Sequence, residues 1–337
     1  MKGATVTEPV EQIIKSAIQN QCPHASAIAL VDVRSLDERS SLPDYVVRAR
    51  WISDDVTQIG QFLIKASTST NAAIESVLLP ALASKEIPVP RVLLAAPSDY
   101  GSYLVQEYLS GRRMSQNLVD ASMRWEISAL GFTYGRLLAQ IHSLAWADVV
   151  PWMGDADAAP ESIVDDQLDA WWVAWEEQFS RVPAEYLSVC EDALAWLDER
   201  RPSEVSLCLC HGDYRQAQVL MADDDVLAVL GWNNALITDA SYDLALMPFD
   251  IRVLGLPAED SDLLHQAIIG SYLQASSRAI GNLPFYAVAR LLSAGLQVLV
   301  QGERATSPIS AFSSDVDELF AAMRDVMSEG RKPLWRA

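Results

Sequence analysis

The chain has 337 residues, of which 25 are Lys or Arg and 45 are Asp or Glu, so its formal net charge is −20. Half of the residues are apolar, which is enough to bury a core and excludes a disordered chain, and the length indicates two domains or two lobes. The acidity argues against nucleic acid as a partner, because a phosphate backbone would be repelled and the densest basic stretches are pairs rather than clusters. Such a charge suits a neutral or cationic small-molecule ligand.

The cysteine pattern and the apolar segments indicate a cytoplasmic protein. The four cysteines lack the two-residue spacing of a zinc or redox pair, and we expect them to be reduced and mostly buried. They are Cys22, Cys190, Cys208 and Cys210. The first residues contain no apolar core of signal-peptide length, and the longest apolar stretch, residues 287–300, is interrupted by Arg290 and Gln297. We therefore expect no contact with a membrane.

Residues 1–108 are predicted to form a small lobe built on an antiparallel sheet. Apolar residues at helical spacing over 10–18 predict a short amphipathic helix. Three short β-rich runs separated by polar turns then predict a meander, with strands over 27–33, 44–52 and 61–66. A helix over 71–83 follows, the proline-containing segment 87–93 must leave the helix, and residues 103–109 alternate as a further strand.

Residues 109–337 are predicted to form a larger and mainly helical lobe. Apolar stripes predict helices over 127–144, 167–179, 187–200, 262–277, 283–300 and 315–328. Two short strands are predicted among these helices, over 205–210 and 226–230. The order of elements predicts an α+β chain of two lobes with a hinge near residues 107–111.

Residues 208–245 contain the motifs that carry chemistry. They begin Cys-Leu-Cys-His-Gly-Asp-Tyr-Arg-Gln-Ala-Gln-Val-Leu, followed by Val-Leu-Gly-Trp-Asn-Asn from residue 229 and Thr-Asp-Ala-Ser-Tyr-Asp-Leu-Ala from residue 238. A strand, a turn with one carboxylate, a short element and a second strand form the layout of a phosphoryl-transfer catalytic loop, in which an Asp accepts a hydroxyl proton. Asp213 is therefore the candidate catalytic residue, although its carboxylate could also serve only to cap its own loop.

These motifs resemble those of the aminoglycoside phosphotransferase and choline kinase family, a branch of the protein-kinase-like fold. The family pattern has His-Gly-Asp, four residues and Asn, then Ile-Asp-Trp, Gly-Asp-Pro and Asp-Leu-Ala, and this chain keeps the order and spacing of those blocks. Residues 87–93 resemble its Val-Pro-Val-Pro segment, and residues 137–144 resemble its Leu-Leu-Ala-x-Leu-His helix. The resemblance covers roughly residues 25–300 and implies a two-lobed kinase-like fold with a ligand cleft between the lobes.

The resemblance also implies a nucleotide site, from which this chain departs. Lys65 resembles the lysine that pairs nucleotide phosphates, and Glu75 resembles its ion-pair partner; we expect these two to pair even without a nucleotide. The family holds magnesium through the Asn of the first motif and the Asp of Ile-Asp-Trp, where this chain has Gln218 and Gly231. Glycine offers no ligand, and magnesium demands near-octahedral oxygen geometry, usually with a carboxylate. The turn over 37–44 contains acids and no glycine, which disfavours a triphosphate. We expect a vestigial nucleotide site and no metal.

Further residues are candidates for binding a substrate. They are Arg215, Trp232, Trp171, Trp172, Trp175 and Asp239. The family places its acceptor substrate near the helix that matches residues 167–179, where aromatic walls and carboxylates can hold a flat or cationic ligand; the alternative is an amphipathic helix whose Trp side chains pack. Arg215 either reaches an anionic group of a ligand or pairs with Asp213. Asp239 either fixes the loop after Trp232 or replaces a metal ligand.

We predict a repurposed member of the family that acts on a natural-product-like small molecule of secondary metabolism. Asp213 would serve as general acid or base, or as an orienting carboxylate, in a cyclisation, elimination or isomerisation without a cofactor. One alternative is a small-molecule phosphotransferase that uses ATP and Mg with Gln218 and Asp239 as atypical metal ligands. The other is a non-catalytic, ligand-binding protein of the pseudokinase type.

Overall fold

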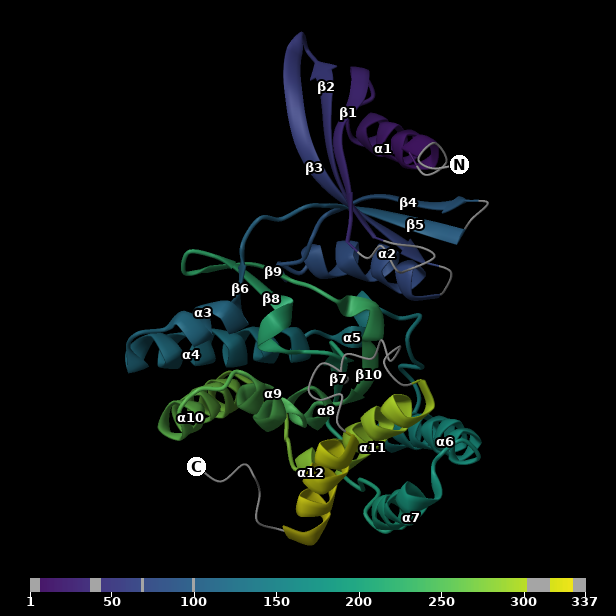
Figure 1. Ribbon diagram of the computed structural model, residues 1–337, viewed down its shortest axis with the longest axis vertical. Helices are drawn as coiled ribbons and strands as arrows, with labels where there is room; N and C mark the ends of the chain where they lie inside the picture. Colours follow the sequence, from purple (N-terminus) through teal and green to yellow (C-terminus); the bar gives the residue numbers. More distant parts are fainter. Residues whose placement is uncertain (1–6, 37–43, 68–69, 99–100, 302–315, 330–337) are drawn as a thin grey trace. The chain divides into compact units, whose positions relative to one another are not determined.

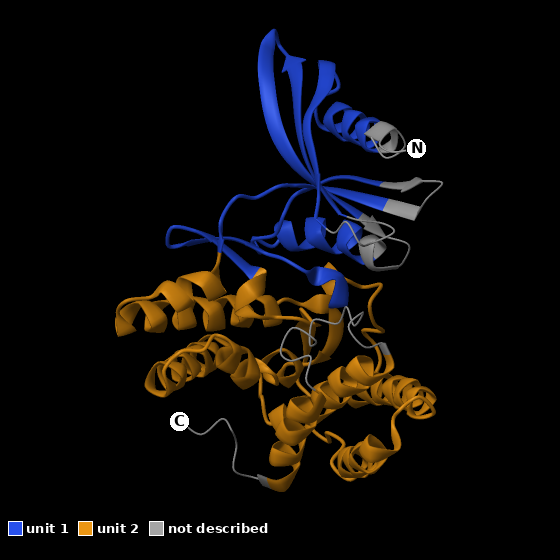
Figure 2. Cartoon of the chain, in the orientation of Figure 1, with its two compact units in different colours: residues 1–112, 219–234 blue, residues 113–218, 235–337 orange. Residues whose placement is uncertain are grey.

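A computed structural model describes residues 7–36, 44–67, 70–98, 101–301 and 316–329 (Figure 1). The chain divides into two compact units (Figure 2). Unit 1 comprises residues 1–112 and 219–234, and unit 2 comprises residues 113–218 and 235–337. The sequence predicted one boundary, between residues 108 and 109, with residues 219–234 in the larger lobe. The structure places residues 219–234 in unit 1 instead.

Unit 1 contains a five-stranded antiparallel sheet of order β1-β2-β3-β5-β4. Its strands are β1 (Ser26–Ser35), β2 (Tyr45–Ser53), β3 (Val56–Ser67), β4 (Val92–Ser98) and β5 (Gly101–Glu107). On β2, buried Val47 and Ala49 alternate with exposed Arg48 and Arg50, as expected for a strand with one face on a core. Helix α1 (Thr7–Gln21) packs its apolar stripe against this sheet and completes the core.

Residues 219–234 belong to unit 1 because they are tied to its second helix and to a proline segment. They form a hairpin of β8 (Val219–Ala222) and β9 (Asp225–Val229), followed by the short η2 (Trp232–Asn234), which packs on α2 (Thr70–Ala83). The two-residue strand β6 (Arg112–Arg113) lies beside β8. The Val229 amide donates a hydrogen bond to the Pro88 carbonyl at 2.8 Å. These contacts are distant in sequence, so local pattern does not reveal them.

Unit 2 is mainly helical. Its helices are α3 (Met114–Asp120), α4 (Arg124–His142), α5 (Trp146–Val149), α6 (Pro160–Phe179), α7 (Ala184–Asp198), α8 (Ser241–Leu244), α9 (Met247–Val253), α10 (Ala258–Ala275), α11 (Leu283–Gln301) and α12 (Val316–Glu329). Helices α4 and α10 pack closely because Gly135 has no side chain: a Cβ there would lie 2.2 Å from Ser271 Oγ and 2.3 Å from the Ile268 carbonyl oxygen. The arrangement confirms the predicted α+β, kinase-like fold.

A two-stranded antiparallel sheet lies within unit 2 and leads into the candidate site. Strand β7 (Leu207–Cys210) pairs with β10 (Leu236–Asp239), and every residue of β7 is buried. The short η1 (Gln216–Gln218) follows β7 after a turn. The predicted strand over 205–210 is thus present as β7. Because β7 is buried, it fixes the start of the turn that follows it.

Helix α11 is long and apolar enough, by composition, to cross a membrane, over Leu283–Val300. However, 67% of that window is buried inside the structure, and Arg290 at its centre is only 4% exposed. The Arg290 guanidinium donates to the carbonyl oxygens of Tyr242 at 2.8 Å and Gly212 at 3.0 Å. Because the helix packs on both sides and holds an internal cation, we interpret α11 as the core helix of unit 2.

Candidate active site

Asp243 fixes the start of the turn that follows β7. Its carboxylate accepts hydrogen bonds from the amides of His211 at 2.6 Å and Gly212 at 2.8 Å, and it lies 3.2 Å from His142 Nε2. Gly212 has φ of +84°, a left-handed conformation that favours glycine and sharpens the turn. Burial alone would raise the pKa of Asp243, but the hydrogen bond from His142 and nearby cationic groups hold it below its ordinary value. The turn therefore rests on an ionised, buried carboxylate.

Asp213 lies in this turn and is only 2% exposed. Arg215 donates from Nε to Oδ1 at 2.6 Å and from an Nη to Oδ2 at 3.0 Å, so the ion pair is bidentate. Gln218 adds a hydrogen bond from its amide nitrogen to Oδ2 at 2.6 Å. Burial lowers the pKa of Arg215, but the hydrogen bond to Asp213 and its negative charge raise it above the ordinary value. Of the two predicted roles of Arg215, the structure shows the pairing with Asp213.

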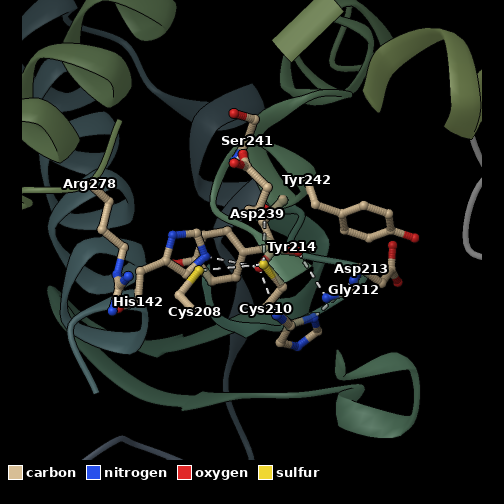
Figure 3. A network of polar contacts seen from close by, with 12 residues as sticks. His142, Cys208, Cys210, Gly212, Asp213, Tyr214, Asp239, Ser241, Tyr242 and Arg278 are labelled. Carbon is tan, nitrogen blue, oxygen red and sulfur yellow. Dashed lines mark hydrogen bonds and ion pairs between the residues drawn. The ribbon is translucent and has the colours of Figure 1, made fainter. Parts of the chain in front are cut away.

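A pair of tyrosines holds the backbone beside Asp213. The Tyr134 hydroxyl donates to the Tyr214 carbonyl at 2.7 Å, and the Tyr214 hydroxyl donates to the Tyr134 carbonyl at 3.1 Å. Burial, with nearby carboxylates, raises the pKa of both hydroxyls, so they remain neutral donors. The reciprocal bonds lock the loop onto α4, and Figure 3 shows Tyr214 among the residues that surround this turn.

Asp239 is part of the scaffold rather than of an open site. Its Oδ1 accepts the Ser241 amide at 2.7 Å, and its Oδ2 accepts the Ser206 amide at 2.9 Å and the Asn282 side-chain amide at 3.0 Å. The residue is 1% exposed. Because these bonds engage both oxygens, the geometry supports the loop-fixing interpretation and not the predicted contact with substrate or metal.

The tryptophans of α6 do not form a single open aromatic wall. Trp175 is 3% exposed and donates from Nε1 to Ser293 Oγ at 3.0 Å. The Arg201 guanidinium lies over the Trp172 ring, 5.2 Å from its centre, and is itself ion-paired with Asp169 at 3.0 Å. The predicted wall is therefore corrected: Trp175 is a core residue, and an arginine already covers one face of Trp172.

Trp171 is the α6 tryptophan that lies near the motifs of residues 208–245. Its ring centre lies 5.7 Å from that of Tyr242, a half-buried residue between Asp239 and Asp243 in sequence order. The sequence analysis did not select Tyr242. Its place one residue before the Asp of the Asp-Leu-Ala block is the signal that could have identified it.

The predicted pair of Lys65 and Glu75 is present in unit 1. Lys65 Nζ, on β3, forms an ion pair with Glu75 Oε2, on α2, and Glu75 is 2% exposed. Trp232 also lies in unit 1, where it is fully buried and donates from Nε1 to the Val229 carbonyl at 3.0 Å. Trp232 is therefore a packed residue rather than the substrate contact that we predicted. Residues 37–43, most of the predicted acidic turn, lie outside the described residues.

The sequence and the fold were compared with known proteins. The sequence model of the phosphotransferase enzyme family matches residues 44–278, well over half of the chain. The chain belongs to the phosphotransferase enzyme family. None of the curated proteins compared with the chain matches it.

Solved structures of this family share the fold along nearly the whole chain. A thermostable mutant of aminoglycoside phosphotransferase APH(4)-Ia in its apo form has a TM-score of 0.62 at 15% identity, covering 90% of this chain and 97% of the other. A putative aminoglycoside phosphotransferase from Ralstonia eutropha JMP134 has a TM-score of 0.60 at 19% identity, covering 96% and 98%. Macrolide 2′-phosphotransferase MphH from Brachybacterium faecium has a TM-score of 0.58 at 17% identity, covering 94% and 98%. At these identities the likeness establishes the fold.

The donor set of this phosphotransferase-family chain does not fit a magnesium ion at the positions that the family motif implies. Gly231 has no side chain, and its φ of +81° is one that glycine adopts readily. The Gln218 amide nitrogen is directed at Asp213, and Asp239 is engaged by three donors. Magnesium needs several oxygen ligands in near-octahedral order. These residues present no such group.

Asp250, on α9, is a candidate that the sequence analysis missed. It is 7% exposed and accepts the Gln216 amide at 3.1 Å, so it contacts the same loop as Asp213. Burial raises its pKa to about 7; the Gln216 amide and Arg215 oppose the shift, while the negative charge of Asp213 adds to it. A single Asp in an apolar helix gave no spacing signal. Two buried carboxyl groups, those of Asp213 and Asp250, therefore contact one loop of this family member.

Proposed function

We propose that this phosphotransferase-family protein binds a small molecule and acts on it by proton transfer, without transferring phosphate from Mg-ATP. The observation that carries the proposal is the closed cluster at Asp213, where Arg215 and Gln218 donate three hydrogen bonds to one carboxylate. In phosphoryl transfer from Mg-ATP, magnesium must neutralise the phosphates. Here a guanidinium already neutralises the carboxylate, and Gly231 supplies no ligand.

The pairing with Arg215 suits Asp213 to orienting a substrate. A carboxylate held by a guanidinium keeps some acceptor capacity, which can take a hydroxyl or an ammonium group of a ligand. Asp250 can hold a proton near pH 7 and contacts the same loop. A carboxyl group whose pKa lies near neutral pH suits general acid or base catalysis. Cyclisation, elimination and isomerisation need no more than this, and the net charge of −20 favours a neutral or cationic substrate.

The proposed setting is cytoplasmic, with a natural-product-like substrate from secondary metabolism. Three observations support this setting. The chain shares its fold with antibiotic phosphotransferases, it is acidic, and its apolar helix α11 packs inside unit 2.

The test is a metabolite panel incubated with the purified chain, with and without ATP and magnesium, and followed by mass spectrometry. The proposal predicts a substrate whose conversion leaves the mass unchanged or loses a small neutral molecule, and does not require ATP. Asp213→Asn, which preserves shape but removes the charge, should lower that turnover by about a hundredfold or more while the protein stays folded. Binding without turnover would instead identify a non-catalytic binding protein.

One observation favours a second candidate, an ATP-dependent small-molecule phosphotransferase. The Lys65–Glu75 ion pair is intact, and Glu75 is buried, as the resemblance implies for a nucleotide site. In the same panel this candidate predicts a product heavier by one phosphoryl group, formed only with ATP. Gln218→Ala would then impair turnover as strongly as Asp213→Asn, whereas the acid–base proposal predicts a mild effect.

A further inference from the structure

Three side chains of unit 2 lie close together and precede the Asp213 turn in the sequence. The proposed function does not use them. His142 comes from α4, and Cys208 and Cys210 come from β7; all three are fully buried (Figure 3). One potential ligand atom from each lies within 4.8 Å of the other two. Within the described parts of the chain, no other group of His, Cys, Asp or Glu side chains meets this condition.

The two cysteines are spaced as ligands of one ion. They are two residues apart on a strand, so their side chains share a face, and their sulfur atoms lie 3.6 Å apart. Two thiolates bound to one tetrahedral zinc at about 2.3 Å each lie about 3.8 Å from one another. A disulfide, in contrast, needs an S–S distance of about 2.05 Å, and the Cα spacing of alternate strand residues, about 6.7 Å, lies at the upper limit for one. The spacing favours a shared ion over a disulfide.

Both ring nitrogens of His142 have hydrogen-bond partners. Nε2 lies 3.2 Å from Asp243 Oδ2, and Nδ1 lies 2.8 Å from the Tyr272 hydroxyl. A histidine that binds a metal through one nitrogen usually keeps a hydrogen-bond partner on the other. His142 can therefore bind an ion through one ring nitrogen in place of that nitrogen's present partner, while the other nitrogen keeps its own.

We propose that Cys208, Cys210 and His142 bind one thiophilic metal ion, Zn²⁺, as a structural site. Two sulfur donors and one imidazole select a soft or borderline ion and not the Mg²⁺ of phosphoryl transfer. Binding releases the protons of both thiols, and one small ligand completes four-coordination. The buried charges then balance: two thiolates and Asp243 are opposed by the zinc ion and by Arg278, whose guanidinium donates to the carbonyl oxygens of His142 and Leu207.

An ion at this position would also affect the turn that contains Asp213. Cys210 is followed directly by His211 and Gly212, whose amides are held by Asp243, and Asp243 also holds His142. An ion on this cluster ties α4, β7 and the turn together, so it should stabilise the folded chain. Zinc binding at this cluster does not depend on the reaction that we propose for Asp213.

The experiment measures zinc in the full chain purified with a reductant, by inductively coupled plasma mass spectrometry, before and after refolding with Zn²⁺. We expect a single zinc ion per chain, and, after replacement by Co²⁺, a thiolate-to-cobalt charge-transfer absorption. Cys208→Ser and Cys210→Ser should each lose the metal and weaken that absorption. Cys190→Ser is the matched control, because Cys190 is a fully buried cysteine on another element, α7, and should leave both readouts unchanged.

Folding is checked separately by circular dichroism. If a serine variant does not fold, the wild-type chain still decides the question, because refolding with Zn²⁺ should raise its melting temperature above that of the chain refolded with a chelator. Reduced, folded wild-type protein that holds no zinc after refolding with Zn²⁺ would overturn the proposal. So would metal content that is equal in wild-type and Cys208→Ser protein, or a Cys208–Cys210 disulfide found by mass spectrometry in protein purified without a reductant.

Discussion

Arg215 donates hydrogen bonds to both carboxylate oxygens of Asp213, with Nε 2.6 Å from Oδ1 and an Nη 3.0 Å from Oδ2. The two residues are separated by a single residue in the sequence, so the turn that presents the carboxylate also supplies its counter-ion. Asp213 is 2% exposed, and the Arg215 side chain is 15% exposed. The charge at the centre of the family motif is thus balanced within the chain itself.

This ion pair predicts a strongly coupled mutant cycle. Arg215→Met leaves Asp213 buried without its counter-ion and should lower the free energy of unfolding by about 3 to 5 kcal/mol. The double variant Asp213→Asn with Arg215→Met removes both charges and should lose less than the sum of the two single variants. Urea denaturation of the four proteins measures the coupling; strictly additive losses would show that the pair does not form in solution.

The pair in unit 1 predicts a similar but smaller coupling. Lys65 is partly exposed, while Glu75 is buried, so Lys65→Met should cost roughly 1 to 4 kcal/mol by leaving the glutamate unpaired. Replacing both, with Lys65→Met and Glu75→Leu, should cost less than that. Thermal or chemical denaturation checks the cycle, and a double variant that is less stable than either single one would be evidence against the contact.

Asp250 predicts a pH dependence of stability. Its pKa is raised to about 7 in the folded chain, against about 3.9 in an unfolded one, so between these values the folded state binds more protons. The stabilisation from this group is therefore complete below about pH 4 and is lost as pH rises through about 7. Asp250→Asn, which can still accept the Gln216 amide, should remove this part of the decline.

The measurement is the free energy of unfolding of wild-type and Asp250→Asn protein at pH 5 and at pH 8. Between pH 5 and pH 8 the wild-type chain should lose more free energy of unfolding than the Asp250→Asn protein. The difference should be about 1.4 kcal/mol for each unit of the pKa shift that lies in that pH interval. Equal losses in the two proteins would mean that Asp250 titrates at an ordinary pKa.

The contact between α4 and α10 predicts opposite effects for two glycine substitutions. Gly135→Ala places a methyl group 2.2 Å from Ser271 Oγ and 2.3 Å from the Ile268 carbonyl oxygen, so the helices must separate and the protein should lose several kcal/mol. Gly270→Ala, on α10, meets no atom within 4 Å and should be neutral or stabilise by up to about 1 kcal/mol. Denaturation midpoints compare them; similar midpoints would contradict the close packing of α4 on α10.

The sequence predicted those features that depend on local pattern or on motif order. Periodicity predicted the strands β1, β2, β3 and β5 of unit 1 and the strand before Asp213, but not β4, and the resemblance to the family implied the Lys65–Glu75 pair. The choice between a ligand contact and an ion pair for Arg215 depends on side-chain direction, which spacing leaves open. The packing of residues 219–234 depends on contacts with Pro88 and α2, which are distant in sequence.

The tryptophans and Asp250 show the same limit. Helical spacing placed Trp171, Trp172 and Trp175 on one helix, but only tertiary packing decides that Trp175 is buried and that Arg201 covers Trp172. Asp250 carries no motif, because its importance comes from burial against a loop that precedes it by more than thirty residues in sequence.

The most direct test of the central claim is calorimetric titration of the chain with ATP and magnesium. The matched control is the double variant Gly231→Asp with Gln218→Asn, which restores the two ligand types of the family motif; Asp is among the residues that tolerate the left-handed backbone at position 231. We expect no magnesium-dependent heat of binding for the wild-type chain at micromolar concentrations and a gain of such binding in the variant. Magnesium-dependent ATP binding by the wild-type chain, abolished by a chelator, would show instead that the chain binds Mg-ATP as a phosphotransferase does.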